Sequence, residues 1–188
     1  MQNFLSSSQS SRCFCFQPAS TPESGFTLLE MLVVVVMVGM LAAIAAPSWA
    51  AFFNTHRLNS EIDEVLQGIR MTQSQAKRTH QVWQFSIREQ NGMVQWATHA
   101  ASLAPTSAKW NSLDSAIKLD PETSLQTAGG VRRVQFDMDG TVNGQLGRVT
   151  LRTTISARLQ RCVIISTLLG AVRVSKNQPS AQSGRFCY

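Results

Sequence analysis

The feature that most constrains this chain is an apolar stretch near its N-terminus. From Phe26 to Ala46 the sequence has 21 residues and a single charged side chain, Glu30. At about 1.5 Å per residue, a helix of this length spans about 31 Å, close to the thickness of a bilayer's hydrocarbon core. We therefore expect a membrane-spanning helix close to the start of the chain.

The residues before this stretch are not expected to fold. Residues 1–24 are rich in Ser and Gln and show no periodic pattern. A secretory signal peptide would carry a cleavage site after its apolar region, whereas here the Gly25–Phe26 junction comes before it. Cleavage at this junction would remove a leader and keep the apolar helix in the mature protein.

Glu30 is the residue that an ordinary single-pass anchor does not explain. A carboxylate inside an apolar span costs about 2.5–3.5 kcal/mol at the centre and less near an end, so it needs a partner. Cleavage after Gly25 would create one, the new α-amino group of Phe26. Because side chains at a helix start point outward, we expect Glu30 to meet the amine of a staggered neighbouring subunit.

The residues from Gly25 to Glu30 read G-F-T-L-L-E and precede a long apolar run. This segment resembles the N-terminal motif of type IV pilins and type II secretion pseudopilins. The resemblance implies that a prepilin peptidase cuts between Gly25 and Phe26 and methylates Phe26, and that Glu30 acts in assembly. It also implies a single-pass protein of the bacterial inner membrane, with its C-terminal domain in the periplasm.

Beyond the apolar stretch, the pattern becomes that of an amphipathic helix. Apolar residues recur at helical spacing, and most charged residues lie off their stripe. The stripe consists of Leu58, Ile62, Val65, Leu66, Ile69 and Ala76. We expect it to pack on a β-sheet, because it is short for the alternative, a coiled-coil partner helix.

From residue 81 onward, apolar and polar residues alternate as they do in strands. Strands are expected at 82–88, 92–98, 117–119, 131–137, 148–153, 161–166 and 171–175. One long helix packed on antiparallel strands gives an α+β fold. The expected division is a leader over 1–25, a transmembrane and polymerisation helix over 26–53, an amphipathic helix over 54–80 and a β-rich globular domain over 81–188.

The order of these elements resembles the GspH/FimT branch of the pseudopilins. The similar segments include VQFDMDGTV from Val134 and RCVIISTLLGAVRV from Arg161. The resemblance implies a pilin fold and a minor pilin or pseudopilin that assembles with other subunits. Some FimT-type members bind DNA through Gly-Arg-x-Arg. The corresponding stretch here is Gly170-Ala171-Val172-Arg173, which keeps only the second arginine.

Positive charge is concentrated in the last third of the chain. Residues 131–188 contain nine Lys and Arg residues and only two acidic ones. Arg148 and Arg152 fall on one face of an expected strand, and Arg173 lies on another strand. Together they predict a basic strip that contacts the phosphates of a polyanion such as DNA. A solvated surface and contact with an acidic neighbouring subunit are the alternatives.

Two cysteines remain after the expected cleavage, Cys162 and Cys187. Outside a membrane they predict one disulfide that ties down the C-terminus, with two free thiols as the alternative. The three histidines are isolated, and the Asp137-x-Asp139-Gly140 segment lacks the later acidic ligands of a calcium loop, so it is read as a turn. We therefore expect no catalytic residues, no metal and no cofactor.

Overall fold

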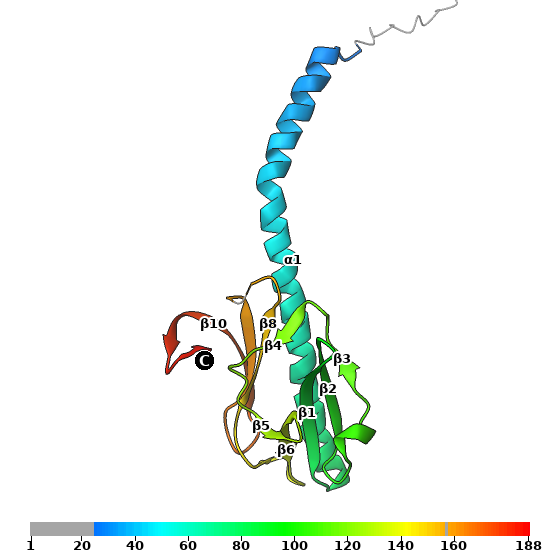
Figure 1. Ribbon diagram of the computed structural model, residues 1–188, viewed down its shortest axis with the longest axis vertical. Coiled ribbons are helices and arrows are strands. Elements are labelled where there is room, and N and C mark those ends of the chain that lie inside the picture. Colours follow the sequence, from blue (N-terminus) through cyan, green and yellow to red (C-terminus); the bar gives the residue numbers. More distant parts are fainter. Residues whose placement is uncertain (1–24, 157) are drawn as a thin grey trace, which may run out of the picture. The chain divides into compact units, whose positions relative to one another are not determined.

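The computed structural model describes residues 25–156 and 158–188 of the chain (Figure 1). The predicted leader up to residue 24, with Cys13 and Cys15, therefore lies outside the described residues. The described chain divides into two compact units. Residues 25–44 belong to the first, and residues 45–188 form the second.

The first long element is helix α1 (Leu28–Thr79). Within the second unit, the side chains of one helix face are completely or almost completely buried, namely Leu58, Ile62, Val65, Ile69 and Ala76. Leu66 packs against this core from a partly buried position. The predicted amphipathic stripe is thereby confirmed, and it packs on β-sheets.

Two antiparallel sheets follow the helix in the chain. The first has the order β3-β2-β1-β6-β5, with β7 paired to β6. Its strands are β1 (Trp83–Gln90), β2 (Met93–Ala100), β3 (Asn111–Ser112), β5 (Gln126–Ala128), β6 (Val131–Phe136) and β7 (Val142–Asn143). A short 3-10 helix, η1 (Pro105–Ser107), lies between β2 and β3.

The second sheet has the order β11-β10-β9-β8-β4. Its strands are β4 (Ile117–Leu119), β8 (Arg148–Thr153), β9 (Gln160–Ile165), β10 (Val172–Gln182) and β11 (Arg185–Cys187). The two C-terminal strands, orange and red in Figure 1, form the end of this sheet.

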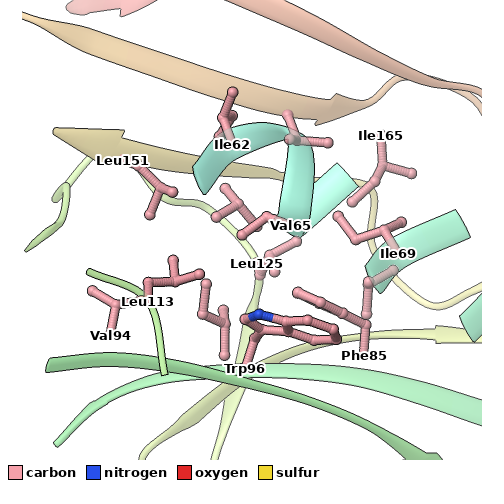
Figure 2. Close-up of a cluster of buried hydrophobic side chains, with 14 of the residues drawn as sticks. Ile62, Val65, Ile69, Phe85, Val94, Trp96, Leu113, Leu125, Leu151 and Ile165 are labelled. Carbon is pink, nitrogen blue, oxygen red and sulfur yellow. The ribbon is translucent and has the colours of Figure 1, made fainter. Parts of the chain in front are cut away.

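The core lies where α1 meets both sheets. Figure 2 shows turns of α1, with Ile62, Val65 and Ile69, between strands of the two sheets. Phe85 and Trp96 of the first sheet stack with their ring centroids 5.9 Å apart. The Trp96 indole N–H donates to a Glu64 carboxylate oxygen at 2.9 Å, so the one polar atom of this large side chain has a partner on the helix.

The structure confirms the α+β class, with one long N-terminal helix packed on antiparallel strands. The predicted strands at 117–119 and 148–153 coincide with β4 and β8. The prediction for 171–175 was too short, because β10 runs on to Gln182 by pairing with β11. The polar residues of that extension carry no alternating pattern, so only the pairing itself reveals them as a strand.

Close packing of α1 against the first sheet depends on a glycine. A methyl group at Gly68 would lie 2.8 Å and 2.9 Å from two ring atoms of Trp96 and 3.0 Å from the Phe85 ring. Both rings belong to the packed core, so neither can move aside easily. Gly68 therefore sets how near the helix axis comes to the sheet.

We predict that Gly68→Ala lowers the free energy of unfolding by about 1–3 kcal/mol through overpacking, even though alanine is the better helix former. Chemical denaturation of the detergent-solubilised protein measures this change. Gln67→Ala, at the exposed neighbouring position, is the control and should stay within about 0.5 kcal/mol of wild type. A Gly68→Ala variant as stable as wild type would contradict this packing argument.

Candidate functional site

The first candidate site is the apolar part of α1. Its large apolar side chains are exposed, from 41% at Val33 to 84% at Leu28. Among the described residues, α1 is the one helix that is long and apolar enough to cross a membrane by length and composition. Leaving so much contiguous apolar surface in water is unfavourable, so this segment needs an apolar environment.

Thr27 and Glu30 occupy the start of this helix. The Thr27 hydroxyl oxygen accepts a hydrogen bond from the backbone N–H of Glu30 at 3.2 Å, as in an N-terminal cap. The T-x-x-E spacing is that of a capping box, and a carboxylate in the first turn also interacts favourably with the helix dipole. No ion pair joins Glu30 to another residue in the described part of the chain.

The second candidate site is the C-terminal end of the chain. Cys162 of β9 and Cys187 of β11 form the predicted disulfide, and both residues are fully buried. With Ile164 they make a small apolar cluster of their own. The backbone N–H groups of Phe186 and Cys187 also donate to the Glu122 carboxylate, at 3.0 Å and 3.3 Å. A covalent bond and hydrogen bonds to a charged side chain thus both hold the tail.

Arg148 and Arg173 lie on one face of the second sheet. Ile164 of β9 pairs with Arg148 of β8 on one side and with Arg173 of β10 on the other. Partial burial lowers the pKa of the Arg148 guanidinium, and the nearby positive charges of Arg185 and Arg173 lower it further against the opposing effect of Glu122. Arg148 also donates a hydrogen bond to the backbone carbonyl of Cys187. These three arginines, Arg148, Arg173 and Arg185, are called the arginine cluster below.

Arg185 was missed in the sequence analysis, although a signal for it was present. It lies two residues before Cys187, so a disulfide to Cys162 would bring it beside β9. Arg148 and Arg185 both line a shallow hollow of about 300 Å³. An anion there would meet two guanidinium groups from strands far apart in the sequence.

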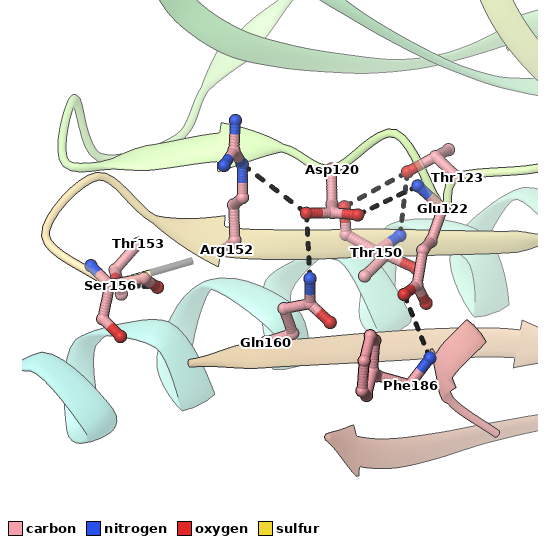
Figure 3. Close-up of polar contacts among 9 residues, drawn as sticks. All are labelled: Asp120, Glu122, Thr123, Thr150, Arg152, Thr153, Ser156, Gln160 and Phe186. Carbon is pink, nitrogen blue, oxygen red and sulfur yellow. Dashed lines mark hydrogen bonds and ion pairs between the residues drawn. The ribbon is translucent and has the colours of Figure 1, made fainter. Parts of the chain in front are cut away.

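Arg152, the third residue of the predicted basic strip, has a different environment. Its Nε lies 3.5 Å from the carboxylate of Asp120, a side chain that is almost fully buried (Figure 3). Gln160 donates to the same carboxylate oxygen at 3.0 Å. The charge of Arg152 is therefore balanced within the protein, and its main contribution is to compensate a buried carboxylate.

The segment from Asp137 to Thr141 forms a turn. The Asp137 carboxylate accepts from the backbone N–H groups of Asp139 at 3.1 Å and Thr141 at 2.9 Å. The Thr141 hydroxyl donates to it as well, which is the main reason that the pKa of Asp137 is lowered. The described residues contain no cluster of three His, Cys, Asp or Glu side chains that could hold a metal.

Two models of known protein families match parts of the chain. The model for the prokaryotic N-terminal methylation motif matches residues 21–46, and the model for type II transport protein GspH matches residues 61–169. The chain belongs to the GspH family. Families of this kind consist of type IV pilin-like structural subunits. No curated protein and no solved structure matches the chain.

The two matches cover different parts of this GspH-family protein. The methylation motif covers Gly25, Phe26 and Glu30, and the GspH match covers the sheets as far as Leu169. The hairpin of β10 and β11 lies beyond both matches and carries Cys187 and two members of the arginine cluster. The C-terminal site is therefore a feature that the family match alone does not describe.

We predict that the disulfide stabilises this GspH-family protein. The cysteines are 25 residues apart, and a loop of this size is expected to contribute about 3.5 kcal/mol. The double variant Cys162→Ser/Cys187→Ser should lose about that much free energy of unfolding in urea. Dithiothreitol should destabilise the wild type and leave the double variant unchanged. Equal stability of the oxidised wild type and the double variant would refute the prediction.

Proposed function

We propose that this chain is a minor pilin or pseudopilin subunit of a type IV pilus or type II secretion filament. Prepilin peptidase cuts it between Gly25 and Phe26 and methylates Phe26. The apolar helix then holds it in the bacterial inner membrane, with the β-rich domain in the periplasm, until it assembles with other subunits. In this account residues 1–25 are the leader, and 26–53 are the segment used for both membrane insertion and polymerisation.

One observation carries this proposal: the methylation motif coincides with the exposed apolar part of α1. Such a helix needs lipid or other apolar helices around it. In lipid and in a filament core alike, a carboxylate at Glu30 is expensive unless it is paired. The N-terminal amine of a neighbouring subunit supplies the opposite charge only after cleavage, so processing and assembly are linked.

The charge of Glu30 can be tested apart from its place in the capping box. Glu30→Gln has nearly the same size and can still act in a capping box, but without a negative charge it cannot form an ion pair with an ammonium group. We predict that this variant is inserted and cleaved like wild type and enters filaments at least tenfold less, equivalent to about 1.4 kcal/mol. Quantitative immunoblotting of sheared or cross-linked filaments measures incorporation.

Glu30→Asp is the matched control, since it keeps the charge with a shorter reach, and it should assemble better than Glu30→Gln. Mass spectrometry of each variant checks that cleavage was unaffected. If Glu30→Gln entered filaments as efficiently as wild type, charge pairing would have no part in assembly.

A second candidate function is DNA binding during uptake, and the arginine cluster favours it. Arg173 and Arg185 lie close enough to Arg148 to lower its pKa, and among the described residues Glu122 is the one carboxylate that opposes them. A charge arrangement of this kind contacts phosphates without reading sequence. Arg152 is left out of this proposal because Asp120 already balances its charge.

We predict that the full-length protein in detergent binds a labelled DNA duplex more weakly as salt rises from about 50 to 200 mM. Arg148→Gln/Arg173→Gln/Arg185→Gln should weaken binding and reduce the slope of log K against log salt by about two to three. Fluorescence anisotropy gives both quantities. Arg152→Gln is the control and should keep the slope of wild type. Absence of salt-sensitive binding would rule out this second function.

A further inference from the structure

A second hollow, of about 720 Å³, lies on the second unit and shares no lining residue with the hollow beside Arg148 and Arg185. Its walls come from segments far apart in the sequence: Glu122, Gln160 at the start of β9, Asn177 in β10 and Phe186 in β11, together with Arg158. Gln178 and Pro179 complete the lining, so several polar side chains and one aromatic ring converge on one space. We call this space the amide pocket, after Gln160 and Asn177.

Gln160 lines the amide pocket and has an unpaired side-chain oxygen. The side chain is only 8% exposed, and its Nε2 donates to the Asp120 carboxylate at 3.0 Å (Figure 3). The carboxylate fixes this orientation, because a flipped amide would set oxygen against oxygen. The Oε1 atom is buried and accepts no hydrogen bond from any residue that the structure describes.

Asn177 repeats this arrangement from the neighbouring strand. Its Nδ2 donates to the backbone carbonyl of Arg158 at 2.8 Å. A carbonyl only accepts hydrogen bonds, so this contact also fixes which way the amide faces. The Asn177 Oδ1 atom is buried and has no donor within the described chain. Two oriented amides line the same hollow, and each has a buried oxygen without a donor.

Unpaired buried acceptors are unfavourable, so these two oxygens need donors from outside the chain. Either water or a ligand with hydrogen-bond donors can supply them. The remaining walls favour a ligand. Phe186 is 42% exposed and lines the pocket. Its backbone is fixed by the Glu122 carboxylate and by the disulfide at the next residue.

The charges around the amide pocket favour a neutral ligand. Glu122 and Arg158 both line it, so the wall carries one negative and one positive group. A peptide is the competing ligand. One edge of β10 pairs with β11 here, whereas its pairing with β9 ends at Lys176, so the test includes a peptide probe.

We propose that the amide pocket binds a neutral saccharide. Sugar hydroxyls donate to the two amide oxygens and accept from the Arg158 guanidinium, and the apolar C–H face of a sugar ring packs on Phe186. The residues that carry this inference are Arg158, Gln160 of β9, Asn177 of β10 and Phe186 of β11. It does not depend on Glu30, on the arginine cluster or on assembly.

The test uses the full-length protein in lauryldimethylamine oxide, a detergent without a sugar headgroup. The probes are the tetramer of N-acetylglucosamine, maltotetraose and tetra-alanine. Nuclear magnetic resonance follows the side-chain amide signals of Gln160 and Asn177 during each titration. We expect saturable shifts of both signals with at least one saccharide and none with the peptide.

Phe186→Leu should weaken saccharide binding about fivefold to tenfold through loss of the ring face. Asn177→Ala should weaken it about threefold to tenfold through loss of one acceptor. Asn143→Ala, an exposed asparagine outside the pocket, should bind as wild type. Backbone amide spectra and an intact disulfide show that each variant is folded.

Three results would overturn the inference. The first is the absence of saturable shifts with both saccharides, which would leave water as the partner of the amide oxygens. The second is saturable binding of tetra-alanine at these signals instead. The third is saccharide binding that Phe186→Leu and Asn177→Ala both leave unchanged, which would place the sugar elsewhere on the protein.

Discussion

Burial of one face of α1 between two sheets is the interaction on which the globular unit depends. Neither sheet alone could bury its apolar face, because residues of both contribute to the same core as Ile62, Val65 and Ile69. The close approach at Gly68 and the paired indole of Trp96 fix the helix against the first sheet. The outer face of the second sheet is then free to carry the C-terminal sites.

The same helix has a second requirement at its other end. Between Phe26 and Ile44 the large apolar side chains are exposed, and no packed core covers them within the described chain. A single element thus combines a stripe for a protein core with an apolar surface for a membrane or for other helices. This combination explains why the methylation motif and the GspH match meet on one helix.

Much of the fold was predictable from the sequence because its long elements carry clear periods. The helical stripe and the hairpin of β1 and β2 are examples, and β8 was predicted with the correct bounds. The division into two sheets was not predicted. Strands as short as β3, β5 and β11 contain too few residues to show a period, and their pairing depends on contacts between distant segments.

The sites were predictable to a similar degree. The disulfide was predicted from the two cysteines that remain after the expected cleavage, and the structure contains it. Arg152, in contrast, is paired with Asp120. No sequence pattern indicates a buried partner of this kind. The amide pocket could not be predicted from the sequence for the same reason. Gln160 and Asn177 are ordinary polar residues until the contacts of their N–H₂ groups fix where their oxygens point.

The central claim is that the exposed helix is the start of a processed filament subunit. Mass spectrometry of the protein from membranes of cells with an active prepilin peptidase tests it most directly. The account predicts a mature N-terminal peptide that begins at Phe26 and carries one added methyl group. A protein that still begins at Met1, or one cut after Ala46 so that the apolar helix is lost, would contradict it.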